Sequence, residues 1–172
     1  ARLYDMFQDN VDYQTWGKWL KQQLAAQGIT DGLVLDLGCG SGILSIAALR
    51  LGAESAFACD IDEKCVDVAY ENAALNGIGK DRYTVRWGDV LTDAALRQEM
   101  GAGYDIVVAN IVADVIMGLS PHVRPFLKPG GLFLCSGIID DRAAEVLEKL
   151  KADGWDVFEQ RSSEGWFSYL CK

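Results

Sequence analysis

Three glycines at alternate positions follow an acidic residue in the stretch VLDLGCGSGILS, residues 34–45. The glycines are Gly38, Gly40 and Gly42, and the acidic residue is Asp36. Glycine is costly in regular structure, so this spacing predicts a backbone that a ligand approaches closely. A strand-like run before the loop and a helical pattern after it place the loop in the usual ligand crevice of an open α/β sheet.

The spacing within the loop separates two classes of ligand. A dinucleotide site would show Gly-x-Gly-x-x-Gly, with a pyrophosphate at the helix N-terminus. Here the pattern is Gly-x-Gly-x-Gly, and the carboxylate of Asp36 suits a cationic or ammonium-bearing ligand better than a pyrophosphate. A nicotinamide dehydrogenase is therefore a poor match.

Three further polar residues end predicted strands. Asp60 lies in ACDID, Asp89 in WGDV and Asn110 in VVAN. The carboxyl ends of parallel strands meet at one edge of a sheet, so these side chains and the glycine loop should share one site. A single Asp at a strand end is weak evidence, because Asp is a common turn former. Asp62 is an alternative to Asp60, but its place before a helical pattern favours a helix cap.

Apolar runs of strand length alternate with helical patterns, which predicts a parallel sheet covered by helices. The expected strands are 33–38, 55–60, 83–88, 104–110, 131–137, 155–162 and 166–172. The last two are separated by only 163–165 and should form an antiparallel hairpin. The expected helices are 42–52, 62–77, 91–101, 112–127 (broken near Pro121) and 140–154, and 127–131 is an expected turn. The predicted fold is a Rossmann-like α/β fold with a seven-stranded, mostly parallel sheet and helices on both faces.

The length of 172 residues predicts a single domain. Residues 31–172 would form the cofactor-binding core, and residues 1–30 an aromatic segment followed by a covering helix. The aromatic residues of that segment include Tyr4, Tyr13 and Trp16. They either pack at a sheet edge or form a lid over a ligand.

The net charge of −9 disfavours an extended nucleic-acid surface and is compatible with a basic protein partner or with solubility alone. Five scattered cysteines predict free thiols in a reducing compartment. The single histidine, His122, excludes a His-rich metal site and fits a helix-face or surface position. No apolar run suits a membrane helix and no signal peptide is evident, so a cytoplasmic protein is expected.

The glycine loop resembles the first motif of class I S-adenosylmethionine-dependent methyltransferases. In that family the glycines let the backbone approach the methionine part of the cofactor, and the acidic residue helps hold its ammonium end. The resemblance implies that Asp60 binds both ribose hydroxyls, Asp89 binds the exocyclic amine of adenine, and Asn110 lies beside the methyl-donating sulfur. The implied cofactor-binding residues are Asp36, Gly38, Cys39, Gly40, Gly42, Asp60, Ile61, Asp89, Val90 and Asn110.

Residues 33–172 are similar to the catalytic domain of the ribosomal protein L-eleven methyltransferase family. The similarity is carried by LDLGCGSGILSIAALRLGA, DIDEKCVDVAYENAALNG, YDIVVANIVADVI, LKPGGLFLCSGI and the closing Gly165-Trp166, with NIVAD at 110–114 the most specific part. That family methylates lysine side-chain and N-terminal amines of its ribosomal protein. Its N-terminal recruiting domain and its threonine-rich approach to the glycine strand have no counterpart here. Residues 1–20 instead look like the N-terminal segment of small stand-alone methyltransferases.

Asn110 is the expected catalytic residue, because its side-chain oxygen can accept a hydrogen bond from an amine and orient the lone pair. Alternatively, Asn110 only caps the strand or holds the cofactor. Asp114 either assists or caps a helix. Three functions stay open: methyl transfer to a protein amine, plausibly of a basic ribosomal protein; methyl transfer to a small molecule or other acceptor; and a non-catalytic cofactor-binding or engineered domain. Methyl transfer would leave S-adenosylhomocysteine as the product.

Overall fold

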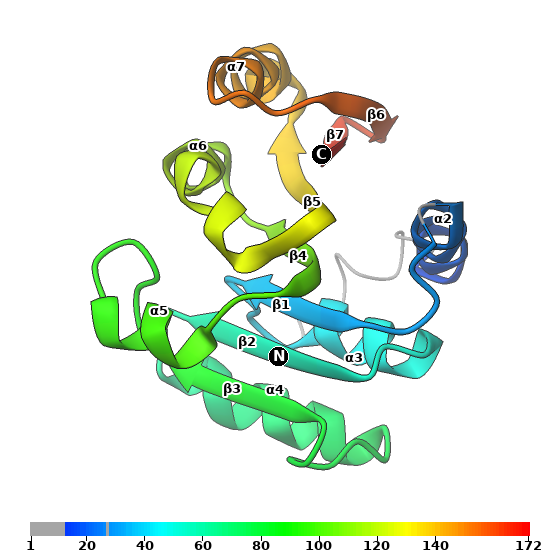
Figure 1. Ribbon diagram of the computed structural model, residues 1–172, viewed down its shortest axis with the longest axis vertical. Coiled ribbons are helices and arrows are strands. Elements are labelled where there is room, and N and C mark those ends of the chain that lie inside the picture. The colour runs from blue at the N-terminus through cyan, green and yellow to red at the C-terminus, as the bar shows by residue number, and fades with distance from the viewer. Residues whose placement is uncertain (1–12, 27) are drawn as a thin grey trace. The chain divides into compact units, whose positions relative to one another are not determined.

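Seven strands form one sheet within residues 31–172 (Figure 1). They are β1 (Leu33–Leu37), β2 (Ser55–Asp60), β3 (Tyr83–Trp87), β4 (Tyr104–Asn110), β5 (Leu127–Ile139), β6 (Val157–Ser163) and β7 (Trp166–Cys171). Their order is β3-β2-β1-β4-β5-β7-β6, and β7 runs antiparallel to both of its neighbours, β5 and β6. The predicted mostly parallel sheet with an antiparallel hairpin is confirmed.

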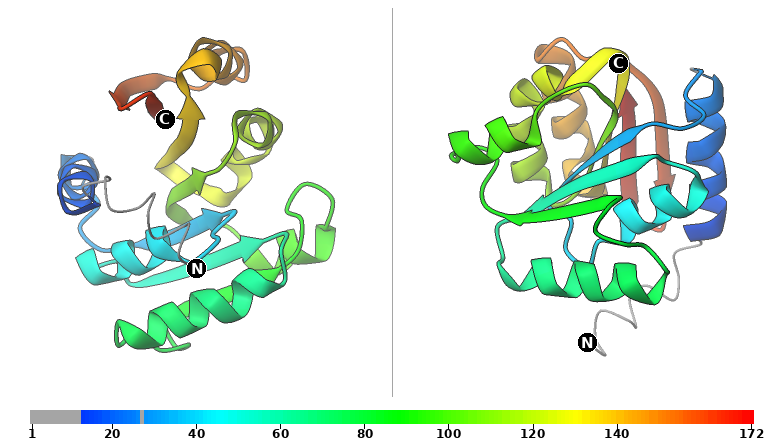
Figure 2. Two further views of the ribbon diagram at one scale, coloured as in Figure 1. Left: turned by 180° about the vertical axis from the view of Figure 1, so that it is seen from behind. Right: turned by 60° about the horizontal axis from the view of Figure 1, so that its bottom comes forward.

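Helices cover both faces of this sheet (Figures 1 and 2). On one face lie α3 (Ile43–Leu51) and α4 (Lys64–Leu75); on the other lie α5 (Ala94–Met100), α6 (Ala113–Leu119) and α7 (Asp140–Ala152). After α6 the chain continues in two 3-10 turns, η1 (Ser120–His122) and η2 (Arg124–Phe126). Each of these turns carries a proline in its first positions, which confirms the predicted break near Pro121.

The computed structural model describes residues 13–26 and 28–172. The chain divides into two units, 1–30 and 31–172. The first unit contains α2 (Tyr13–Ala26). Tyr4 and the side chains of Tyr13 and Trp16 lie outside the described residues. Whether these aromatic residues form a lid over a ligand or pack at a sheet edge therefore stays a prediction. The single domain also stays a prediction.

The start of β5 differs from the prediction. The segment 127–131, expected as a turn, belongs to the strand: Tyr104 of β4 pairs with Leu127, and Ile106 pairs with Leu132. Residues 128–131 therefore bulge out opposite a single residue of β4. Pro129 lacks an N–H for the ladder, so the sequence pattern resembled a turn although the strand resumes beyond it.

The hairpin turn is also tighter than expected. Ser163 pairs with Trp166, which leaves only Glu164 and Gly165 in the turn. Both have positive φ, 51° and 82°, as a two-residue turn between twisted strands requires. Glu164 is the one non-glycine residue with positive φ among those described.

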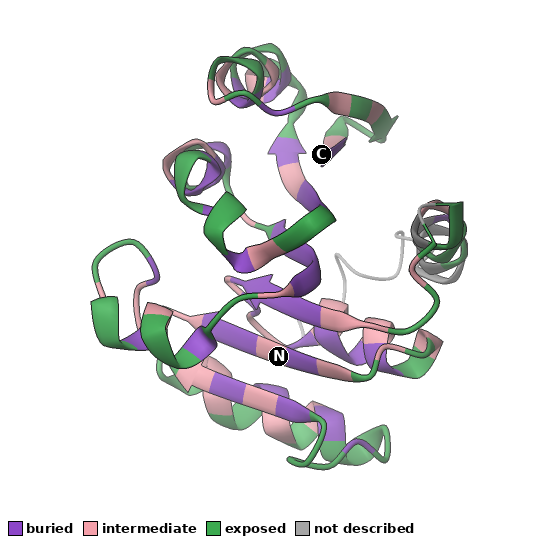
Figure 3. Cartoon of the chain, in the orientation of Figure 1, coloured by how far each residue is buried: buried purple, intermediate pink, exposed green. Residues whose placement is uncertain are grey.

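The core lies between the central strands and α5–α7, and the buried positions run along β1, β4 and β5 (Figure 3). Its members include Leu35 and Leu37 of β1, Val107 of β4 and Ile116 of α6, none more than 1% exposed. Polar residues of the site must therefore stand at the strand ends, because the strand interiors are filled.

One buried carboxylate joins three strands at the edge opposite the glycine loop. Asp105 is 6% exposed, and its Oδ2 accepts the N–H of Leu33 at 2.8 Å. Its Oδ1 pairs with the ammonium of Lys128 in the β5 bulge. A Cβ at Gly32 would lie 2.5 Å from Asp105 Oδ2, so the close approach needs glycine there. Asp105 thus holds the starts of β1, β4 and β5 together.

Asp105→Ala should lower the free energy of unfolding by about 1–3 kcal/mol, because the Leu33 N–H and Lys128 both lose their acceptor. Urea unfolding at neutral pH measures the loss. Glu99→Ala is the control, since it removes an ion pair to Arg86 between two half-exposed side chains, worth less than about 1 kcal/mol. Equal small losses in the two variants would show that Asp105 does not join the strands.

Candidate active site

The glycine loop lies between β1 and α3. The N–H groups of Gly38 and Cys39 both donate to the carbonyl of Cys59, at 2.9 and 3.1 Å, which fixes the loop to the end of β2. Gly38, Gly40 and Gly42 have φ values of 73°, 51° and 79°. Side chains rarely adopt this left-handed conformation, so the backbone alone favours glycine at all three positions.

Packing against the protein adds a second requirement for glycine at two of them. A Cβ at Gly38 would lie 2.5 Å from Cγ2 of Ile111. A Cβ at Gly42 would lie 2.7 Å from the hydroxyl of Tyr83 and 3.1 Å from Cβ of Ala69. Gly38 and Gly42 are thus also required by close contacts with β3, α4 and the segment after β4. The sequence interpretation attributed the glycine spacing to a ligand alone.

Asp36 is buried beneath the loop and caps α3. It is 1% exposed, and its Oδ2 accepts the N–H and the hydroxyl of Ser45, at 3.2 and 2.7 Å. Gly42 at the N-cap has no side chain for this role, so the cap comes from β1. Ser45 was not predicted from the sequence, although a glycine at the N-cap position indicates that the cap must come from elsewhere.

The second oxygen of Asp36 has no partner. Oδ1 is buried and accepts no hydrogen bond from the described residues. Desolvation, helped by the nearby charge of Asp60 and opposed by the hydrogen bonds from Ser45, raises the pKa of Asp36 to about 6. A buried, unpaired carboxylate oxygen is costly. It fits an ammonium group, bound directly or through water.

Asp60 joins the end of β2 to the glycine loop. Its Oδ2 accepts the N–H of Gly40 at 2.8 Å, and its Oδ1 accepts the N–H of Asp62 at 2.9 Å. The carboxylate of Asp62 in turn accepts the N–H of Lys64, the first residue of α4, at 3.0 Å. The N-cap of α4 is Glu63, one residue after the cap predicted at Asp62, although the side chain of Asp62 does bind a free N–H at the start of the helix. Each oxygen of Asp60 keeps a lone pair for a further donor.

Asp89 forms a turn after β3. Its two oxygens accept the N–H of Leu91 and the hydroxyl of Thr92, both at 2.9 Å. The neighbouring Val90 is buried. The carboxylate of Asp89 is therefore fixed by its own turn, and any contact with a ligand must use its remaining lone pairs.

Ile61, next to Asp60, is 74% exposed. Its carbonyl accepts the indole N–H of Trp87 at 3.1 Å, and Trp87 is itself 60% exposed. Two large apolar side chains thus stay exposed at the ends of β2 and β3.

Asn110 stands exposed at the end of β4, and β5 positions its amide. Its Oδ1 accepts the hydroxyl of Ser136, the residue opposite in β5, at 3.1 Å. A β-bulge at Ser136–Gly137 shifts the register with β7, and Gly137 has φ of 80°. A Cβ at Gly137 would lie 2.7 Å from Asn110 Oδ1. Bulges beside functional sites commonly re-aim side chains in this way.

Ser136 and Gly137 were missed in the sequence. The signal was present, because Ser136 is a polar residue next to the end of a predicted strand, as Asp60, Asp89 and Asn110 are at or next to theirs. It was not used, since serine at a strand end is unremarkable without the bulge that aims it.

Asp114 is unsuited to either role expected of it. It lies in the first turn of α6, where the N-cap is Val112, and forms a 2.7 Å ion pair with Arg142 of α7. The hydrogen bond from Arg142, and then its charge, lower the pKa of Asp114. A carboxylate with a lowered pKa is a weaker base, so Asp114 instead links two helices.

The thiols near the loop have raised pKa values. All five cysteines are free, and all but Cys65 are buried. Desolvation raises the pKa of Cys59 to about 12 and that of Cys65 to about 11, and also raises that of Cys39. Within the described ranges no three His, Cys, Asp or Glu residues form a group that could hold a metal. In the same ranges, no helix is long and apolar enough to cross a membrane.

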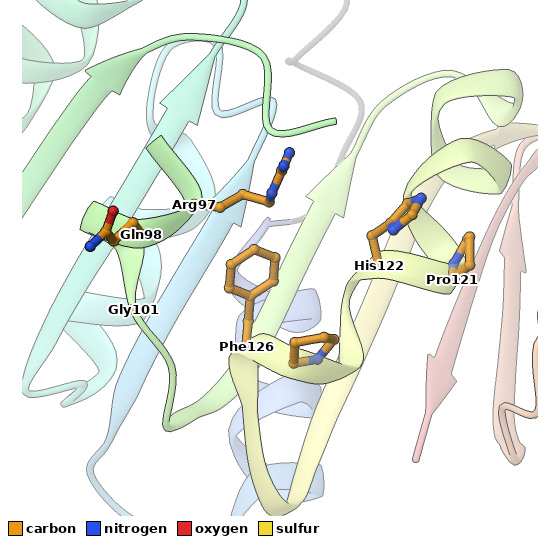
Figure 4. Close-up of a pocket in the computed structure, with 7 residues that line it drawn as sticks. Arg97, Gln98, Gly101, Pro121, His122 and Phe126 are labelled. Atoms are coloured by element: carbon orange, nitrogen blue, oxygen red, sulfur yellow. The ribbon is translucent and has the colours of Figure 1, made fainter. Parts of the chain in front are cut away.

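A pocket of about 380 Å³ lies apart from these residues, between α5 and the two 3-10 turns (Figure 4). It is lined by Arg97, Gln98, Gly101, Pro121, His122, Pro125 and Phe126. The guanidinium of Arg97 donates to the carbonyl of Val90 at 2.7 Å and so supports the chain behind Asp89. None of the predicted site residues lines this pocket.

The sheet order and the loop after β1 define a class I methyltransferase fold. A solved S-adenosylmethionine-dependent methyltransferase from Clostridium acetobutylicum matches with a TM-score of 0.78 at 14% identity, over 100% of this chain and 96% of that one. The family model for ribosomal protein L11 methyltransferase (PrmA) matches residues 18–172. The chain belongs to this family.

Individual relatives agree with this assignment. The ribosomal protein L11 methyltransferase of Caldanaerobacter subterraneus is 42% identical over 81% of this chain and 42% of the relative. That of Agathobacter rectalis is 43% identical over 81% and 43%. A solved ribosomal protein L11 methylase from Lactobacillus delbrueckii matches with a TM-score of 0.75 at 30% identity, over 89% of this chain and 78% of that one. The chain spans less than half the length of these curated relatives.

Asp36→Asn should change how stability depends on pH. The pKa of Asp36 in the folded chain, about 6, lies above the value of about 3.9 for an exposed Asp. Between these values the folded state binds the proton and the unfolded state does not, so this contribution to stability falls as pH rises. From pH 4 to pH 7 the wild type should lose roughly 2 kcal/mol more unfolding free energy than the variant. Parallel pH profiles from urea unfolding would contradict the shift.

Gly137→Ala should destabilise the chain more than Gly130→Ala. Both glycines lie in β5 with φ of 80°, so the backbone strain is matched. Only the methyl group at 137 meets protein atoms, including N and O of Ile111 at 3.1 Å, whereas that at 130 meets nothing within 4 Å. We expect an additional loss of about 1–3 kcal/mol at 137, measured by thermal unfolding. Equal losses would mean that the bulge does not hold Asn110.

Proposed function

We propose that this chain is an S-adenosylmethionine-dependent methyltransferase acting on an amine of a ribosomal protein. Membership of the PrmA family over residues 18–172 supports the reaction and the acceptor class. One observation carries the proposal: β1, β2 and β4 all bring a polar side chain to the same sheet edge, and Asp60 is bonded there to the glycine loop. The net charge of −9 favours a basic acceptor, and a ribosomal acceptor implies a cytoplasmic protein.

The residues at this edge fit the cofactor. The unpaired Oδ1 of Asp36 suits its ammonium end. The free lone pairs of Asp60 suit the ribose hydroxyls, and those of Asp89 the adenine amine. Cys39, Ile61 and Val90 would line the same site, beside Gly38, Gly40 and Gly42. When bound, S-adenosylmethionine supplies a methyl group activated by its sulfonium.

Asn110 would orient the acceptor. Its Oδ1 accepts one hydrogen bond from Ser136, which leaves a second lone pair for the N–H of an incoming amine. In-line displacement from an activated leaving group depends mainly on such alignment. Asp114 is paired with Arg142, which lowers its pKa and makes it a weaker base. The amine would therefore arrive neutral, and after methylation its proton would pass to water.

The test is the intact mass of ribosomal protein L11 after incubation with the chain and S-adenosylmethionine. Methyl-sized additions are expected with the wild type. Asn110→Ala should lower turnover at least tenfold with cofactor affinity nearly unchanged. Asp60→Ala should weaken cofactor binding by about 1–3 kcal/mol, measured calorimetrically, because the ribose loses a charged acceptor.

Two outcomes would revise the proposal. If Asn110→Ala loses affinity and turnover equally, Asn110 is a cofactor ligand and does not orient the amine. If the wild type binds the cofactor but adds no methyl group to L11, the acceptor is a different molecule or the domain only binds its cofactor.

A further inference from the structure

Four large apolar side chains remain exposed near the strand end that carries Asn110. They are Val112, Val115, Ile139 and Trp166, with exposed fractions of 64%, 40%, 47% and 54%. We call these four residues the apolar rim. They come from three separate parts of the chain: the start of α6, the end of β5 and the start of β7.

Hydrogen bonds and strand pairing bring these parts together. Ile139 and Trp166 lie directly opposite each other in the β5–β7 pair. The N–H of Asp140, the first residue of α7, donates to the carbonyl of Gly165 at 2.9 Å. The ion pair from Arg142 to Asp114 then ties α7 to α6, and both views in Figure 2 show these helices side by side.

The rim adjoins the proposed reaction centre. Val112 follows Asn110 by two residues, and the intervening Ile111 donates its N–H to the carbonyl of Ser136 at 3.1 Å. Ile139 stands beyond Ser136 on β5, about 10 Å further along the strand. An extended peptide covers that distance in about three residues.

Acidic side chains border the rim. The exposed members are Asp114, Asp140, Asp141, Glu145 and Glu164. Arg142 lies among them and already binds Asp114 and Glu145, at 2.7 and 2.6 Å. An exposed apolar surface with a polar border is typical of an interaction site. The negative border disfavours nucleic acid, and a second copy of the chain would place two acidic borders face to face.

We propose that the apolar rim binds the acceptor protein itself, as an extended segment with an apolar side chain about three residues from the methylated amine and basic residues on either side. The apolar side chain would lie against Ile139 and Trp166 while the amine reaches Asn110. The proposal rests on the proposed function and adds to it a rule for which amines are methylated.

The test uses two capped peptides, Arg-Phe-Ala-Ala-Lys-Ala-Arg and the same peptide with Ala in place of Phe. Methylation of each is followed by mass spectrometry, with wild type, Trp166→Ser, Val112→Ser and, as control, Leu75→Ser. Leu75 is 86% exposed at the end of α4 and lies outside the rim. The wild type should prefer the Phe peptide at least tenfold in kcat/KM, chiefly through KM. Each rim variant should lose that preference without a change in cofactor affinity, and Leu75→Ser should keep it.

Binding separates this proposal from the proposed function. Fluorescence anisotropy of labelled peptides is measured in the presence of S-adenosylhomocysteine. Tighter binding of the Phe peptide that depends on Trp166, without methylation, would support the rim and contradict the reaction. Equal binding of the two peptides, or equal loss in the rim variants and in Leu75→Ser, would overturn the proposal. So would a dimer in sedimentation that Trp166→Ser dissociates, since the rim would then be covered by a second copy.

Discussion

The site depends on the hydrogen bonds that Ser45, in the first turn of α3, donates to the carboxylate of Asp36. They cross from β1 to the helix because the N-cap position is a glycine without a side chain. The glycine is needed there by a positive φ and by the contact with Tyr83. The conformation of the loop and the burial of the carboxylate are therefore one constraint, and the same burial leaves an oxygen unpaired.

The other half of the site is built by strand pairing. β5 carries a bulge that leaves Ser136 opposite Asn110 and lets Gly137 pass close to the amide. At the far edge, Asp105 fixes the starts of β1, β4 and β5. The two arrangements act on the same strands from opposite ends, so the position of Asn110 depends on both.

Much of this was evident in the sequence, and the exceptions have physical causes. Strand ends at Asp60 and Asn110 were predicted to the residue, because long apolar runs give a clear period. The extension of β5 back to Leu127 was not predicted, because Pro129, Gly130 and Gly131 form the same local pattern in a bulge as in a turn. The cap from Asp36 to Ser45 and the pair from Asp114 to Arg142 join elements distant in the chain, and local pattern carries no information on them.

The distribution of the thiols has a practical consequence. Four cysteines are sealed inside the fold, and Cys65 is only half-buried at the start of α4, close to Asp60. A thiol reagent can thus modify one position in the folded chain, slowly because the pKa of that thiol is raised. The others become accessible only when the sheet itself opens. Counting labels per molecule therefore distinguishes local opening near Asp60 from global unfolding, without any engineered probe.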